Sequence, residues 1–261
     1  MSASESSQVS VKSGPVQQAL RWIGCGWRLL QSSLPLWIGM SFLYLVLAAL
    51  LEVIPFAGHL LLVLLSPMLL AGALYALPTT STATRPSAPA EHITVPARQL
   101  LQAFSNEARV YPAVLMGIMV VGLVVAIAIV QYLIGAGSLT SEWTAARRGV
   151  AQLVSAVFHL VASGVLYALL IMALFYAVHR VVYGHREPMA AIADSFVASR
   201  RNAAALATLV LVFLIPYVLV AGAFQVTPWL GYVAVFSIGL VALPLLVLAS
   251  YCSYRDVFGE R

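Results

Sequence analysis

Charged residues are scarce in this chain of 261 residues: Asp, Glu, Lys and Arg make up 9%, whereas hydrophobic residues make up 62%. Soluble globular domains carry about 25% charged residues. The shortage excludes an ordinary soluble domain, and a mean hydropathy of +0.96 indicates a protein surrounded largely by lipid. The net charge of +5 does not indicate nucleic-acid binding, because the basic residues flank apolar stretches instead of forming one patch.

Catalytic motifs are also missing. The sequence contains no HExxH, GxxxxGKS/T or GxSxG pattern and no pair of aspartates within an apolar stretch. We therefore expect neither an enzyme nor a resident metal or cofactor. An intramembrane enzyme is the least favoured alternative.

Cysteine is almost absent, with only Cys25 and Cys252, both at basic ends of apolar stretches. Disulfides are unusual in a reducing cytoplasm, and two isolated thiols do not complete a zinc site. We therefore expect both cysteines to act as small apolar side chains in the core.

Long apolar stretches dominate what is present. They cover residues 36–54, 57–77, 112–134, 153–178, 203–224 and 229–251. Lengths near 20 residues suit a hydrocarbon layer of about 30 Å at a rise of about 1.5 Å per residue. The sequence thus predicts an all-α polytopic membrane protein, a bundle of six transmembrane helices in three hairpins.

The basic residues predict an orientation for these helices. If the stretches cross the membrane alternately, twelve of the fourteen Lys and Arg residues lie on one side, and only Arg147 and Arg148 lie on the other. Basic residues flanking spans are retained in the cytoplasm. We therefore expect a multi-pass protein of the bacterial inner (plasma) membrane, with both termini cytoplasmic.

The domain organisation follows from composition. Residues 1–14 are polar and read as a disordered cytoplasmic tail, and the first apolar stretch begins too late for a cleavable signal peptide. Residues 15–252 form one membrane domain, with a flexible cytoplasmic linker rich in Ser, Thr, Ala and Pro at 78–96. Residues 253–261 form a cytoplasmic C-terminus.

A short amphipathic segment precedes each predicted hairpin. The apolar stripes are Val16, Leu20, Ile23, Trp27, Leu30 and Leu34, then Ala97, Leu100, Leu101, Phe104 and Ala108, then Met189, Ile192 and Phe196. The helical period predicts helices lying in the cytoplasmic interface of the membrane, with basic residues toward the headgroups. The candidate headgroup contacts are Arg21, Arg28, Arg98, Arg109, Arg200 and Arg201. Three such units predict an internal repeat.

Four polar residues fall near the predicted outer ends of the spans: Glu52, His59, Gln131 and His159. Ionisable groups inside a bilayer cost about 2.5–3.5 kcal/mol each on insertion scales, so such residues are functional candidates. One hypothesis is a polar cluster in which Glu52 and His59 titrate together and bind a cation or a headgroup amine. The simpler interpretation is that all four are hydrated at the interface.

Two further patterns each have a functional and a simpler interpretation. Pro67, Pro216 and Pro244 lie within spans, where a kink could either build a transport site or only shape the packing, and we favour packing. His179 and His185 flank a basic inner loop, but their spacing does not match a zinc pair. Headgroup contact is the simpler interpretation for both histidines.

Five motifs carry a family resemblance: GWRLLQSSLPLW (26–37), IPFAG (54–58), SPMLLAGALY (66–75), DSFVASRRN (194–202) and SYRDVFG (253–259). With these the chain resembles an uncharacterised proteobacterial family of six-span inner-membrane proteins. It is more distantly similar to the membrane domain of some glycerophosphodiester phosphodiesterases. The resemblance implies fold and location, and it transfers no catalytic residue, since no phosphodiesterase domain is present.

These observations favour a non-enzymatic accessory, scaffold or lipid-interacting protein of the cell envelope. Its expected partners are membrane lipids, with a membrane-protein partner or a second copy of the chain as alternatives, and no nucleic acid. The alternative function is a small uncoupled transporter or channel, since no charged residue lies deep in a span to couple ions.

Overall fold

The computed structural model of the chain describes residues 14–55, 57–75, 77, 107–138 and 145–259. The predicted N-terminal tail, the 78–96 linker and most of the second amphipathic segment lie outside the described residues. The described part of the chain is all-α and contains no strand. This confirms the all-α part of the predicted fold class.

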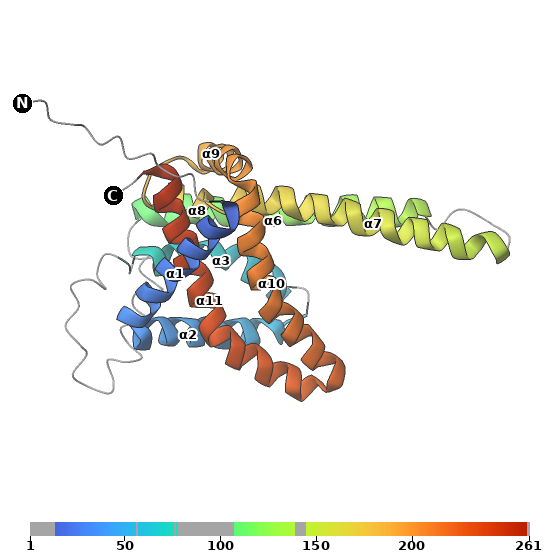
Figure 1. Cartoon of the computed structure of the whole chain (residues 1–261), viewed down its shortest axis with the longest axis horizontal. Helices are drawn as coiled ribbons and strands as arrows, with labels where there is room; N and C mark the ends of the chain where they lie inside the picture. The colour runs from blue at the N-terminus through green and yellow to red at the C-terminus, as the bar shows by residue number, and fades with distance from the viewer. Residues whose placement is uncertain (1–13, 56, 76, 78–106, 139–144, 260–261) are drawn as a thin grey trace, which may run out of the picture.

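The described helices are shown in chain order in Figure 1. They are α1 (Pro15–Ser32), α2 (Leu34–Glu52), α3 (Ala57–Tyr75), α6 (Glu107–Ser138), α7 (Ala145–Leu174), α8 (Ala177–Val182), α9 (Pro188–Arg201), α10 (Ala203–Val226) and α11 (Pro228–Phe258). Pro188 begins α9, as its place in the sequence predicts, because proline at the first turn loses no helical hydrogen bond. Thr227 alone separates α10 from α11, and its hydroxyl caps the Leu230 N–H at 3.2 Å.

Six helices are long and apolar enough to cross a membrane, within the part of the chain that the structure describes. Their apolar segments are Leu34–Glu52, Ala57–Tyr75, Tyr111–Leu133, Leu160–Val182, Ala203–Val226 and Pro228–Phe258. Each segment corresponds to one apolar stretch of the sequence. The structure therefore supports a multi-pass integral membrane protein.

The spans do not form the single bundle that the sequence predicts. Helices α2, α3, α10 and α11 gather with α1, whereas α6 and α7 extend together away from them (Figure 1). Large apolar side chains on this extension are exposed, among them Ile129 (54%), Phe158 (61%) and Leu160 (74%). Lipid solvates such side chains as well as another helix does, so no hydrophobic force closes the bundle.

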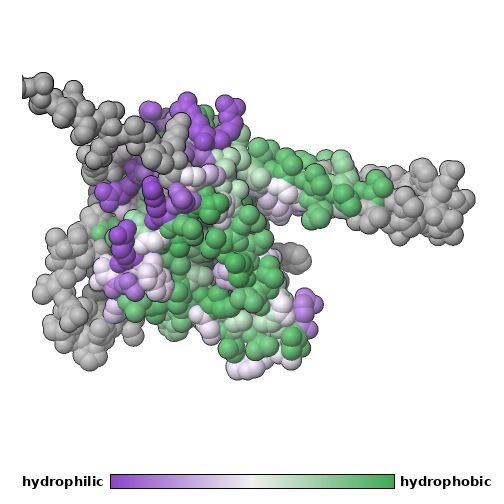
Figure 2. Space-filling view, viewed as in Figure 1, coloured by the Kyte–Doolittle hydropathy of each residue, from purple (hydrophilic) through white to green (hydrophobic). Residues whose placement is uncertain are grey.

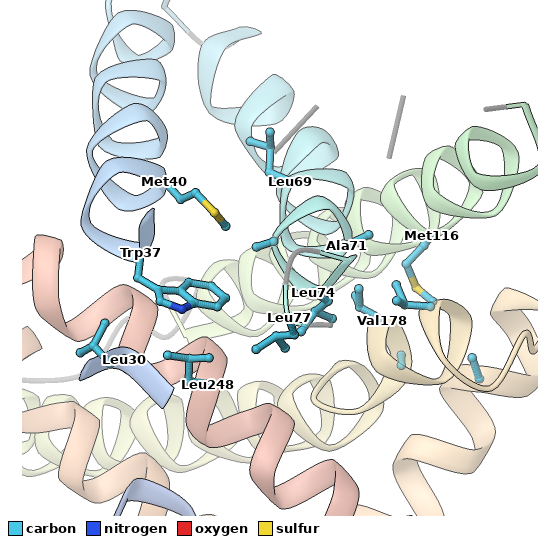
Figure 3. Close-up of a cluster of buried hydrophobic side chains, with 14 residues drawn as sticks. Leu30, Trp37, Met40, Leu69, Ala71, Leu74, Leu77, Met116, Val178 and Leu248 are labelled. Carbon is cyan, nitrogen blue, oxygen red and sulfur yellow. The ribbon is translucent and has the colours of Figure 1, made fainter. Parts of the chain in front are cut away.

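The buried core lies toward one end of the spans. One cluster joins Trp37 at the start of α2, Leu74 at the end of α3, Met116 near the start of α6 and Leu248 late in α11 (Figure 3). A second cluster joins Trp22 of α1, Leu209 early in α10 and Tyr254 near the end of α11. These are the ends that carry the basic residues, and in Figure 2 most of the hydrophilic surface gathers there, with a smaller hydrophilic patch at the lower right and mainly apolar surface between them. We call this region the basic end.

Candidate functional site at the basic end

A break in the fourth span organises the basic end. Helix α7 stops at Leu174 and α8 starts at Ala177, with a turn between them. In a continuous helix the Tyr176 N–H would donate to the Met172 carbonyl, four residues earlier. Here Ser195 of α9 lies between the two: its hydroxyl accepts from the Tyr176 N–H at 3.0 Å and donates to the Met172 oxygen at 3.0 Å. A side chain from another helix thus completes the interrupted backbone bond.

Buried polar groups connect this break to α11. The Tyr176 hydroxyl lies 2.6 Å from the Ser253 hydroxyl, and the His179 Nε2 atom lies 3.3 Å from the Ser250 hydroxyl. His179 is only 1% exposed and stacks on Tyr254 with ring centroids 5.3 Å apart. The prediction that His179 contacts headgroups is therefore wrong, because the α7–α8 break turns its ring into the core. His185 is exposed, outside the core.

Ion pairs hold α9 against α8. The Arg180 guanidinium donates to the Asp194 carboxylate at 2.9 and 3.2 Å, and the Arg186 Nε atom lies 3.3 Å from the same carboxylate. The Arg180 guanidinium also lies 4.6 Å from the ring centre of Phe258 on α11. Two of the basic residues of the inner loop are thus engaged by the protein.

Helix α1 is fastened to α11 by a disulfide between Cys25 and Cys252, whose Cα atoms are 6.2 Å apart. The expectation that the cysteines are two separate apolar side chains is wrong. The reason is the close fit of the helices: a Cβ atom on Gly26 would lie 2.7 Å from the backbone nitrogen of Ala249. The Trp22 Nε1–H donates to Asp256 at 2.9 Å in the same contact.

The predicted headgroup contacts that the structure describes all face outward. Arg21, Arg28, Arg200 and Arg201 are exposed, on α1 and α9. Arg98 and the side chain of Arg109 lie outside the described residues. The exposed guanidinium groups provide positive charge where an anionic surface could reach it.

The predicted outer cluster is only partly assembled. The His59 Nδ1 atom lies 3.3 Å from a Glu52 carboxylate oxygen, and both side chains are exposed, by 67% and 58%. Gly117 of α6 lies against the backbone of Leu64 on α3. Gln131, which is half-buried, lies about 21 Å along α6 from this contact, whereas the outer end of α3 lies about 10 Å from it. The structure therefore brings Glu52 and His59 together without Gln131, and the side chain of His159 lies outside the described residues.

A cavity of about 210 Å³ lies between α2, α3 and α11. It is lined by Trp37, Met40, Ser41, Tyr44, Ser66, Leu69, Leu70, Ala73, Leu243, Pro244 and Val247. The Tyr44 and Ser66 hydroxyls lie 3.4 Å apart, and Ser66 also donates to the Leu62 carbonyl at 2.6 Å. The Trp37 Nε1–H is buried and has no acceptor among the described residues. Of these lining residues the sequence pattern pointed to Pro244 alone, because tryptophan and serine within an apolar stretch are common.

The described residues at the basic end offer exposed positive charge and exposed apolar side chains. Within the described ranges no group of three or more His, Cys, Asp and Glu residues could hold a metal ion. The exposed arginines lie on α1 and α9, and large apolar side chains are exposed along the spans. No protein-family model, curated protein or solved structure matches this chain.

Proposed function

We propose that this chain is a non-enzymatic, lipid-interacting protein of the bacterial inner membrane, acting as an accessory or scaffold of the cell envelope. Three units make up the chain, each a short amphipathic helix followed by a hairpin of two spans. The amphipathic helices lie on the cytoplasmic surface, and both termini are cytoplasmic. Membership of the six-span proteobacterial family that the chain resembles is part of this proposal.

The three faces of α1 carry the proposal. One face packs on the protein through Ala19, Trp22, Gly26 and Leu30. A second face exposes large apolar side chains: Val16 by 53%, Leu20 by 54%, Trp27 by 44% and, at the start of α2, Leu34 by 46%. The third face carries the exposed Arg21 and Arg28. A helix with an apolar face and a basic face, held at the end of a set of spans, suits the boundary between acyl chains and headgroups.

Helix α9 repeats this arrangement on a smaller scale. Its buried face consists of small residues such as Ala191, Ser195 and Ala198. Met189 is 68% exposed, and Arg200 and Arg201 project from its last turn. Basic residues at an anionic membrane surface contribute about 1 kcal/mol each. The four exposed arginines of α1 and α9 together would therefore give a strong preference for anionic lipid.

Lipid retention by the purified protein tests this function. The full chain is exposed to phosphatidylglycerol or phosphatidylcholine in detergent, and bound lipid is counted by native mass spectrometry. The wild-type protein should retain phosphatidylglycerol preferentially, and a variant with Arg21, Arg28, Arg200 and Arg201 replaced by glutamine should lose the preference. The control replaces Arg147 and Arg148, on the opposite side, by glutamine. Equal retention of both lipids by the wild-type protein would reject the function.

Reporter fusions test the orientation separately. At residues 90 and 190, a reporter that works only in the cytoplasm should be active. At residue 140, a reporter that works only outside the cytoplasm should be active. An external reporter at 90 or 190 would contradict the proposed orientation. The lipid measurement does not depend on this result.

A small uncoupled transporter is the second candidate, because two helix prolines lie beside the cavity. Pro244 lines it, and Pro67 follows Ser66, which also lines it. Proline in a transmembrane helix frees a carbonyl and can create a hinge. Flux of small solutes into vesicles containing the purified protein, absent from empty vesicles, would favour the transporter over the accessory function.

A further inference from the structure

The hairpin of α2 and α3 is shorter than the spans around it. Helices α2 and α3 have 19 residues each, whereas the apolar segments of α6 and α10 have 23 and 24 residues. At about 1.5 Å per residue, these lengths are about 28 Å for the hairpin and about 35 Å for its neighbours. A flat bilayer matches both lengths only if the longer helices tilt.

The register of α6 against α3 gives the difference in height. Gly117 of α6 lies against the backbone of Leu64 on α3. From this contact the outer end of α3, at Ala57, is seven residues away, or about 10 Å along the helix. Tyr132 of α6 is fifteen residues away in the same direction, or about 22 Å. Helix α6 therefore passes the α2–α3 turn by about 12 Å at Tyr132, in agreement with the extension of α6 and α7 in Figure 1.

Two exposed tyrosines mark the bilayer on α6. Tyr111 is 72% exposed and Tyr132 is 75% exposed. They are 21 residues apart, or about 32 Å along the helix, close to the thickness of a hydrocarbon layer of about 30 Å. The exposed side chains between them are aliphatic, among them Ile118, Val125 and Ile129. Because tyrosine favours the two membrane–water interfaces, α6 crosses the layer with one of these rings at each interface.

The α2–α3 turn lies inside the level of Tyr132, yet it carries two ionisable side chains. The His59 Nδ1 atom and a Glu52 carboxylate oxygen are 3.3 Å apart, and both side chains are more than half exposed. Ionisable groups are costly inside a hydrocarbon layer. The protein does not enclose this pair, so the cost is lowered only if water reaches the turn. Water reaches it when the outer headgroup layer bends inward on this side of the molecule.

We propose that the bilayer is locally thinner over the α2–α3 hairpin than along α6. Over the hairpin, outer headgroups and water reach Glu52 and His59, whereas along α6 they stay at the level of Tyr132. A bilayer thins in this way around a hydrophobic stretch that is shorter than the layer. The lipid that fits this face has short or disordered acyl chains. The inference goes beyond the proposed function, because it concerns the outer end of the spans and the acyl chains, and the proposed function concerns anionic headgroups at the basic end.

Two exposed valines at the same height test the thinning. Val53 lies in the α2–α3 turn, and Val125 lies eight residues beyond Gly117, or about 12 Å along α6. Val53→Cys and Val125→Cys are purified with the Cys25–Cys252 disulfide intact, so that only the introduced thiol reacts. In vesicles of dioleoyl phosphatidylcholine, Val53→Cys should react with a charged maleimide at least about tenfold faster than Val125→Cys. The reason is that only a hydrated thiol ionises and that the charged reagent does not enter hydrocarbon.

Each outcome of this comparison decides the proposal. Slow reaction at both positions would place the α2–α3 turn inside an undeformed layer, and fast reaction at both would place Val125 at the same water level as the turn. Either result would overturn the thinning. Equal labelling of the two variants in sodium dodecyl sulfate is the control for total thiol. Circular dichroism and gel filtration check folding, and Ile54→Cys with Ala126→Cys is the replacement pair, since both positions are exposed.

The ionisable pair is tested by adding Glu52→Leu and His59→Leu to Val53→Cys. The labelling rate should fall about tenfold, because the turn no longer requires water and sinks into the layer. Vesicles of dimyristoleoyl phosphatidylcholine should restore the fast rate, since a flat layer of shorter chains already ends at the turn. An unchanged rate in dioleoyl phosphatidylcholine would overturn the role of the pair. A slow rate in both lipids would overturn the link between labelling and bilayer thickness.

The lipids in these vesicles carry no net charge, so the result is separate from the preference for phosphatidylglycerol. Loss of that preference in the wild-type protein, with fast labelling of Val53→Cys alone, would reject the proposed function and keep the thinning. Equal labelling of Val53→Cys and Val125→Cys, with the preference intact, would reject the thinning and keep the proposed function.

Discussion

The two ends of the spans are built by different rules. At the basic end, two buried clusters, a hydroxyl inserted into a helix break, an ion-paired loop and a disulfide hold together α1, α2, α3, α6, α8, α9, α10 and α11. Toward the far end, large apolar side chains such as Leu160 and Leu219 are exposed by 74% and 60%. This difference shows that hydrophobicity places these helices in lipid but does not pack them against one another. Specific packing arises where small residues and hydrogen bonds are available.

The difference in packing between the two ends can be tested by truncating one leucine at each end. Leu248→Ala, at a fully buried site, should lower the free energy of unfolding by about 2–5 kcal/mol, because it leaves a cavity in the core. Leu219→Ala, at an exposed site toward the far end of α10, should change it by less than about 0.5 kcal/mol. Denaturation in detergent micelles measures both. Equal losses would show that the far end is packed as tightly as the basic end.

The disulfide should have the next largest effect. Reducing Cys25–Cys252, which joins residues 227 positions apart, should destabilise the oxidised, purified protein by about 2–4 kcal/mol, because it releases a long closed loop. Thermal unfolding with and without reductant measures this loss, and the Cys25→Ser variant serves as the control, since reductant should not affect it.

The redox state of the same disulfide in cells tests the proposed orientation of the protein in the membrane. If the basic end faces the cytoplasm, both cysteines should be found as thiols by maleimide labelling of whole cells, because that compartment is reducing. A bond that stays closed in cells would place the basic end on the oxidising side of the membrane, against the proposed orientation.

The close contact of α1 with α11 can be broken by one methyl group. Gly26→Ala should destabilise the protein by about 1–3 kcal/mol, because its Cβ would lie 2.7 Å from the Ala249 nitrogen and force the helices apart. Gly24→Ala is the matched control two residues away, where a Cβ meets nothing within 4 Å. It should stabilise α1 by about 0.5–1 kcal/mol. Chemical denaturation measures the free energy of unfolding of both variants and distinguishes a loss from a gain.

The helix break depends on one hydroxyl. Ser195→Ala should cost about 1–2 kcal/mol, because it leaves the Tyr176 N–H and the Met172 carbonyl unpaired in the core. Ser32→Ala removes an exposed hydroxyl that bonds only the Leu29 carbonyl of its own helix, and should have little effect. Hydrogen exchange at the Tyr176 amide should rise in the first variant alone. Equal protection in both variants would show that Ser195 does not complete the interrupted backbone bond.

The smallest effect is expected at the outer pair. Glu52→Gln keeps the shape of the side chain and removes the charge opposite His59, yet both side chains are more than half exposed. Exposed ion pairs contribute at most about 1 kcal/mol, and water screens this one. The stability of the variant should match that of the wild-type protein between pH 5 and pH 8. A pH-dependent change in lipid retention would favour the binding cluster over simple hydration.

Particular residues show how far the sequence could predict this protein. The apolar stretches predict all six spans, and Pro188 predicts the start of α9, because both features depend only on residues nearby in the sequence. The burial of His179, the pairing of Cys25 with Cys252 and the cavity at Trp37 were not predicted. Each depends on the rotation and height of one helix against another far away in sequence. Local periodicity carries no information about that register.

The sequence by itself determined that these segments lie in lipid, because a run of about 20 apolar residues spans the hydrocarbon layer whichever helices it packs against. It also determined which ends carry the basic residues. Only the tertiary structure decided that these ends form the packed core, that α6 and α7 extend from it, and that α1 turns Trp22 and Leu30 inward and Leu20 and Trp27 outward. The physical reason is that transfer into lipid is a property of each segment, whereas close packing is a property of pairs.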